Sequence, residues 1–110
     1  MLFNSIFNED LLLTIIRLIR FETVSNEQCT NYLLEINILP KLVSMIDLGV
    51  EEISCETLWV MVNMSLDTNA VNAMRSLKLH YRLVNLFKIS EDSIKEMVIL
   101  HMNLVCLAIR

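Results

Sequence analysis

Apolar residues recur every three or four positions along most of the chain, which is the spacing of one face of an α-helix. Leu12, Ile16 and Ile19 form such a stripe after Asn8, a residue suited to capping a helix. Further start and stop signals divide the remainder of the chain. We predict helices over residues 26–36, 40–48, 50–66, 69–77, 79–89 and 91–110.

Short-range chemistry explains these boundaries. Ser25 with Gln28 has the form of a capping box, while Asp67 or Thr68 and then Ser90 can cap later helices. Pro40 suits a first helical turn, and Gly49 suits the position after a helix. Asn37 is expected to take a left-handed turn conformation, and a loop is expected around Thr23 and Val24.

Composition favours helices as well. Hydrophobic residues make up 55% of the 110 residues. The chain has only one Gly and one Pro, so it nearly lacks the residues that form the turns of an all-β protein. The fold class is therefore expected to be all-α. The length fits one small domain or a piece of a larger one.

The apolar positions also repeat at an offset of 41 residues. This shift pairs Leu42 with Leu83 and Trp59 with Leu100, and, carried backwards, Leu18 with Trp59. A period near forty is typical of armadillo and HEAT units. We therefore expect an armadillo-type α-solenoid of about two and a half repeats: residues 1–24 end one repeat, 25–66 form a complete one, and 67–110 form a degenerate one.

The helix expected over residues 50–66 carries the candidate site. Glu52, Glu56, Trp59 and Asn63 stand three or four residues apart, so a helix places them on one face. A carboxamide can donate to and accept from a peptide unit, and an indole face attracts a cation while covering its methylene stem. This stripe is the best candidate for a binding site in the sequence.

Two passages of the sequence resemble the armadillo family, specifically its importin-alpha branch. Residues 35–43, Glu-Ile-Asn-Ile-Leu-Pro-Lys-Leu-Val, are similar to that family's turn into its second helix, with Asn37 in the place of a glycine. Residues 53–67, ISCETLWVMVNMSLD, are similar to its third helix, including W-x-x-x-N. The resemblance implies a right-handed superhelix of three-helix repeats. It also implies an adaptor for nuclear protein import that binds extended basic peptides, with Asn63 as backbone clamp, Trp59 as the wall of a lysine slot and Glu56 as an auxiliary acceptor.

The neighbouring repeats depart from this pattern. The Trp and Asn positions hold Leu18 and Glu22 one repeat earlier, and Leu100 and Leu104 one repeat later. A generic armadillo or HEAT scaffold for protein interactions, with Trp59 in its core, is therefore the alternative. In both interpretations, a solenoid of so few repeats exposes apolar faces at its two ends. We therefore also expect a longer repeat array or self-association.

Other chemistry is not indicated. The net charge of −4 argues against nucleic acid, charged residues interrupt every apolar run long enough to span a membrane, and no secretory signal is recognisable. Cys29, Cys55 and Cys106 are far apart, and His80 and His101 are isolated, so no disulfide framework, metal, cofactor or enzymatic activity is expected. Reduced thiols and the importin resemblance lead us to expect a cytoplasmic and nuclear location.

Overall fold

The computed structural model describes residues 8–79, 81–83, 92, 95–96 and 98–100. Five helices lie in the continuous part: α2 (Glu9–Thr23), α3 (Glu27–Glu35), α4 (Leu39–Asp47), α5 (Glu51–Met64) and α6 (Thr68–Ser76). The described residues contain no strand, which agrees with the all-α prediction. No helix in this described part is long and apolar enough to cross a membrane. The helices expected over 79–89 and 91–110 fall largely outside the described residues.

Three helices begin at polar caps. The side chain of Asn8 accepts a hydrogen bond from the Leu11 amide, Asn26 caps α3 by accepting from Cys29, and Asp67 caps α6 by accepting from Asn69 and Ala70. The caps at Asn8 and Asp67 were predicted. The cap at Ser25 is wrong, because Ser25 takes a positive φ of 49° in the turn and its neighbour, an equally good cap, takes the role.

The turns around α4 follow the predicted chemistry. Asn37 has a φ of 59° and Gly49 a φ of 75°, both in the left-handed region, and Pro40 lies in the first turn of α4. A further left-handed residue, Lys78 with a φ of 56°, lies 41 positions after Asn37. The loop predicted around Thr23 begins one residue later, because α2 continues through Thr23.

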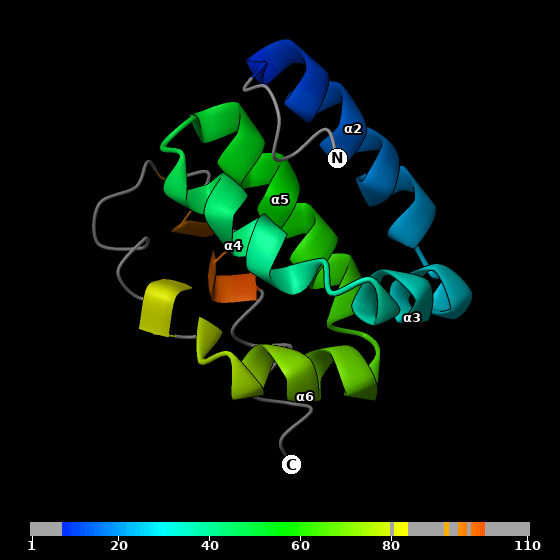
Figure 1. Ribbon diagram of the computed structural model, residues 1–110. Coiled ribbons are helices and arrows are strands. Elements are labelled where there is room, and N and C mark those ends of the chain that lie inside the picture. Colours follow the sequence, from blue (N-terminus) through cyan, green and yellow to red (C-terminus); the bar gives the residue numbers. More distant parts are fainter. Residues whose placement is uncertain (1–7, 80, 84–91, 93–94, 97, 101–110) are drawn as a thin grey trace.

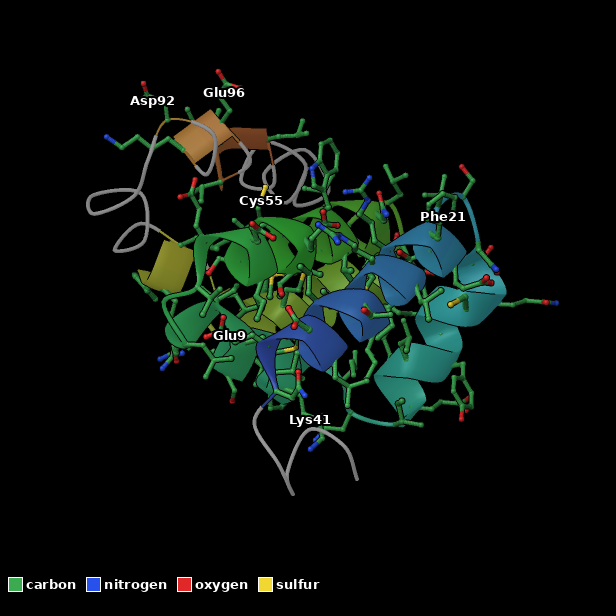
Figure 2. The ribbon with its side chains drawn as sticks, turned by 90° about the horizontal axis from the view of Figure 1, so that it is seen from above. Glu9, Phe21, Lys41, Cys55, Asp92 and Glu96 are labelled. Atoms are coloured by element: carbon green, nitrogen blue, oxygen red, sulfur yellow. The ribbon has the colours of Figure 1, made fainter. Side chains whose placement is uncertain are left out.

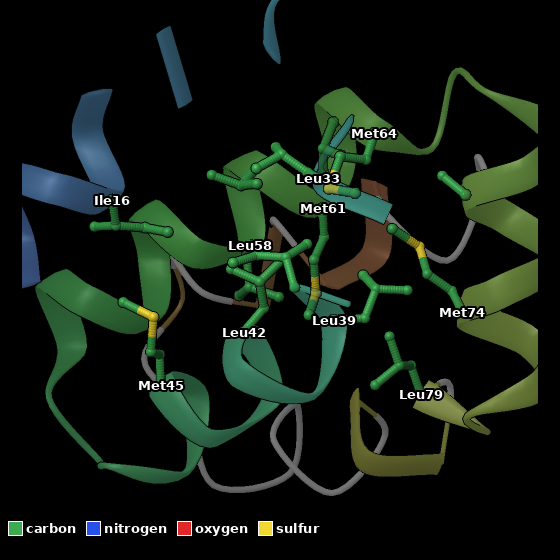
Figure 3. Packing of buried hydrophobic residues seen from close by; sticks show 14 of the residues in the cluster. Ile16, Leu33, Leu39, Leu42, Met45, Leu58, Met61, Met64, Met74 and Leu79 are labelled. Atoms are coloured by element: carbon green, nitrogen blue, oxygen red, sulfur yellow. The ribbon is translucent and has the colours of Figure 1, made fainter. Parts of the chain in front are cut away.

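α5 is the central helix. α2 packs along it on one side and α4 on another, while α3 lies against α6 (Figure 1). More than half of the residues of α5 are buried, so it is apolar around most of its circumference, as expected for a helix covered on several sides. Between α4 and α5, the side chains of Leu42, Leu58 and Met61 pack together (Figure 3), and all three are fully buried. The predicted stripe is therefore placed on the helix that forms the core.

Candidate functional site

The four predicted site residues lie on the side of α5 that faces α2. α2 runs beside α5 along most of its length (Figure 1), and the interactions of Glu52, Glu56, Trp59 and Asn63 with α2 follow in that order down the helix. The structure thus brings the predicted residues together. It also places α2 against them, so the site is the seam between two helices.

Glu56 is the electrostatic centre of this seam. Its Oε2 accepts a hydrogen bond from Nη1 of Arg20 at 2.8 Å, and its Oε1 lies 3.7 Å from Nε of Arg17. The Glu56 side chain is only 14% exposed, so these guanidinium groups replace much of the water that a carboxylate needs. Glu52 is 73% exposed and lies 3.9 Å from Nη2 of Arg17, which makes that ion pair weak.

Trp59 already contacts a cation. The guanidinium carbon of Arg20 lies 5.9 Å from the centroid of the indole ring, within the range of a cation–π interaction. The ring is half-buried and packs against the hydrophobic core. Trp59 therefore serves the core and presents part of its surface to a positively charged group.

Asn63 fastens α5 to the end of α2. Its Nδ2 donates to the backbone oxygen of Arg20 at 3.1 Å and to Oγ1 of Thr23 at 3.2 Å. The Thr23 hydroxyl is buried and bonds to the carbonyl groups of the last turn of α2. The amide group of Asn63 thus satisfies oxygens at a helix end that lacks backbone partners. The described residues supply no donor to the carbonyl Oδ1 of Asn63.

A polar cleft opens beside Asn63, between the α2–α3 turn and the α5–α6 turn. Its volume is about 340 Å³. Most of its lining residues carry a hydroxyl, carboxamide or carboxylate group. The lining comprises Thr23, Ser25, Asn26, Glu27, Thr30, Asn63, Leu66, Asp67, Thr68 and Asn69. Such a lining offers hydrogen-bonding groups beside a similar amount of apolar surface, a mixture that an extended peptide can use.

Several hydrophobic side chains are exposed in the cleft and on α2. Leu66, in its lining, is 70% exposed. On α2, Leu18 is 61% exposed and Phe21 is 78% exposed. Figure 2 shows Phe21 on α2, near the outside of the molecule. The surface around the seam therefore offers apolar contact as well as polar groups.

Sequence reasoning missed the α2 side of the site. Arg17 and Arg20 had no place in the predicted site and a loop was expected at Thr23, yet all three residues contact the α5 stripe. A signal was present, because the 41-residue offset pairs Leu18 with Trp59 and so places α2 beside α5. Two arginines three residues apart on one helix can then meet two glutamates four residues apart on the other.

The other candidate groups add no chemistry. Cys29 and Cys55 are free, and burial raises the pKa of both thiols, with nearby Glu22 adding to the effect at Cys29 and Glu56 at Cys55. Within the described residues, no three His, Cys, Asp or Glu side chains gather as metal ligands. Cys106, His80 and His101 lie outside these residues.

Comparisons with protein-family models, with curated proteins and with solved structures give no match to this chain.

Proposed function

We propose that this chain is a protein-binding segment of an armadillo-type α-solenoid that binds an extended basic peptide at the seam of α2 and α5. Its role would be that of an adaptor resembling importin alpha, which carries proteins with basic signals between cytoplasm and nucleus. The observation that carries this proposal is the position of Arg20. Its guanidinium lies against both Glu56 and Trp59, so this part of the seam already accommodates a cationic side chain.

The helix arrangement supports the solenoid. α2 and α5 lie side by side, and so do α3 and α6, which is the pairing expected when each helix stacks on its counterpart in the next unit. The capped starts of α3 and α6 are 41 residues apart, at Asn26 and Asp67. The left-handed residues Asn37 and Lys78 keep the same offset. This geometric repetition adds to the apolar repeat in the sequence.

The surroundings of Asn63 support an extended ligand. A peptide lying in the neighbouring cleft could donate a backbone N–H to Oδ1 of Asn63, which no described residue uses. Exposed Leu66 could contact an apolar side chain or methylene stem of that peptide. The clamp would then rely on Oδ1, because the amide nitrogen of Asn63 already donates to two oxygens of α2.

A second candidate is a scaffold whose α5 stripe only holds α2 in place. The observation that favours it is the engagement of the stripe within the fold: both carboxylate oxygens of Glu56 and the amide nitrogen of Asn63 contact groups of α2. Such a scaffold would bind partners elsewhere, for example through exposed Phe21 on α2. Peptide titration distinguishes the two functions.

The test uses Trp59, the only tryptophan in the chain, as a fluorescent reporter. An unstructured peptide rich in Lys and Arg is titrated into the protein while the indole emission is recorded. We expect a saturable change for the wild type and roughly tenfold weaker binding for Glu56→Gln, since one charged contact is lost. Glu51→Gln removes the same charge from the same helix outside the stripe and serves as the matched control.

The outcomes separate the candidates. Binding that Glu56→Gln weakens and Glu51→Gln leaves nearly unchanged supports a peptide site at the seam. Equal losses in both variants would mean that only the net charge matters. No emission change at any peptide concentration would leave the scaffold as the function of this chain. Far-UV circular dichroism must first show that each variant keeps the helical content of the wild type.

A further inference from the structure

We propose that the seam selects an arginine side chain of the ligand, which takes the place of Arg20 against Glu56 and Trp59. Arg20 thus acts as an internal competitor that the ligand must displace. This inference rests on the proposed function and adds to it the chemical identity of the recognised residue. Three features of the seam carry it: its charge balance, the burial of Glu56 and the anchoring of the Arg20 backbone.

The charges of the seam are already balanced. Arg17 and Arg20 face Glu52 and Glu56, giving two positive and two negative groups. Glu56 divides its two oxygens between the two guanidinium groups. A ligand cation that entered beside Arg20 would add a third positive charge to a partly desolvated site, where like charges repel more strongly than in water. Replacement of Arg20 keeps the balance.

The burial of Glu56 restricts what can replace Arg20. The Glu56 side chain is 14% exposed, so little water reaches its carboxylate. If no donor took the position of Arg20, this charge would be left poorly solvated, which is costly. A guanidinium is planar, weakly hydrated and able to donate to a carboxylate while lying over an aromatic ring. An ammonium group is strongly hydrated and has no flat face. The seam therefore fits arginine better than lysine.

The anchoring of Arg20 makes the exchange local. Its backbone oxygen is held by Asn63, and the residue lies inside α2, so the main chain need not move. Its side chain is 39% exposed, which places part of the guanidinium in water at the edge of the seam. Rotation about the flexible side-chain bonds is sufficient to vacate the site. Arg17 contacts Glu52 and can remain.

The experiment compares two unstructured peptides of equal length and charge, one with arginine and one with lysine as its only basic residue type. Dissociation constants are measured by Trp59 emission, and by calorimetry as an independent readout, for wild type, Arg20→Gln and Arg17→Gln. Arg17→Gln is the matched control because it removes the same charge, three residues away and without an observed contact to Trp59.

For wild type, we expect the arginine peptide to bind more tightly than the lysine peptide. Arg20→Gln should tighten binding of the arginine peptide by about tenfold, because the cation–π and ion-pair interactions of Arg20 no longer compete. Arg17→Gln should tighten it by a smaller factor that shrinks at high salt, because Arg17 faces Glu56 at 3.7 Å in a weaker ion pair and has no observed contact to Trp59.

Different results overturn the different claims. If peptides bind but Arg20→Gln has the same effect as Arg17→Gln, or weakens binding, Arg20 is not a competitor and the inference is wrong. A wild type that prefers lysine contradicts it even if the Arg20 variant fails to fold. If neither peptide binds wild type or Arg20→Gln, the proposed function fails and this inference with it. Binding to Arg20→Gln alone would support Arg20 as a competitor but would contradict the proposed function, because the wild-type chain would not bind the peptide.

Discussion

Replacing Asn63 separates its structural role from any role in ligand binding. Asn63→Ala removes both hydrogen bonds to the end of α2, whereas Asn63→Asp keeps the size of the side chain but replaces the donating amide with a carboxylate. That carboxylate would face the backbone oxygen of Arg20 and the hydroxyl of Thr23. Asn63→Asp should therefore be the more damaging of the two changes, although it is the smaller change in shape.

The structure gives the expected magnitudes. Two partly buried hydrogen bonds, each worth about 1 kcal/mol net, predict that Asn63→Ala lowers the free energy of unfolding by about 1–2 kcal/mol. Asn63→Asp loses the same bonds and places a negative charge at the negative end of the α2 dipole, so about 2–4 kcal/mol is expected. Each kcal/mol corresponds to roughly 3–6 °C in the melting temperature of a chain of this size.

The assay is urea unfolding followed by circular dichroism, with unfolding free energies compared at equal slope. Asn72→Ala on α6 is the control, because Asn72 is exposed and lies mid-helix, so this change reports the gain in helix propensity alone. If Asn63→Ala were as stable as that control, or if Asn63→Asp matched wild type, Asn63 would not hold α2 and the described seam would be wrong.

Three further predictions concern the rest of the fold. Leu58→Ala, at a fully buried core position, should cost about 2–5 kcal/mol in urea unfolding, while Leu18→Ala, 61% exposed on α2, should stay within about 0.5 kcal/mol. Lys78→Gly should raise the unfolding free energy by about 0.5–1 kcal/mol, because glycine accepts a φ of 56° without steric strain; a loss would contradict the left-handed turn. Since burial raises the pKa of Cys29 and Cys55 above the ordinary 9.0, the unfolded chain loses these protons first, and the unfolding free energy should fall as the pH rises through about 9. At pH 8, mass spectrometry should find both thiols alkylated more slowly in the native protein than in urea, and equal rates would contradict their burial.

Local signals predicted most of the helix boundaries. Asn8, Asp67, Pro40 and Gly49 act on backbone groups within a few residues of themselves, so their effects are visible in the sequence. Such local signals cannot decide between two adjacent residues that are equally able to cap a helix. Ser25 and Asn26 can both cap a helix, and the turn conformation of Ser25 decided between them.

The site was predicted on one helix and missed on the other. The spacing of Glu56, Trp59 and Asn63 places them on one face of α5, and this does not depend on which helix packs against that face. Their partners depend on how α2 is rotated about its own axis, and this rotation is set by the burial of Leu12 and Ile16 in the core. The hydrogen bond between Arg20 and Glu56 joins residues 36 positions apart, so no local pattern could reveal it.

The most direct test of the account compares an arginine peptide with the same peptide in which every arginine is replaced by citrulline. Citrulline keeps the planar shape and three of the five N–H donors, but it has an oxygen in place of one NH2 group and carries no charge. Emission from Trp59 is recorded for both under identical ionic strength. A saturable change with the arginine peptide and none with the citrulline peptide is the result that a cation site at Glu56 and Trp59 predicts. Equal responses to the two peptides, or no response to either, would contradict it.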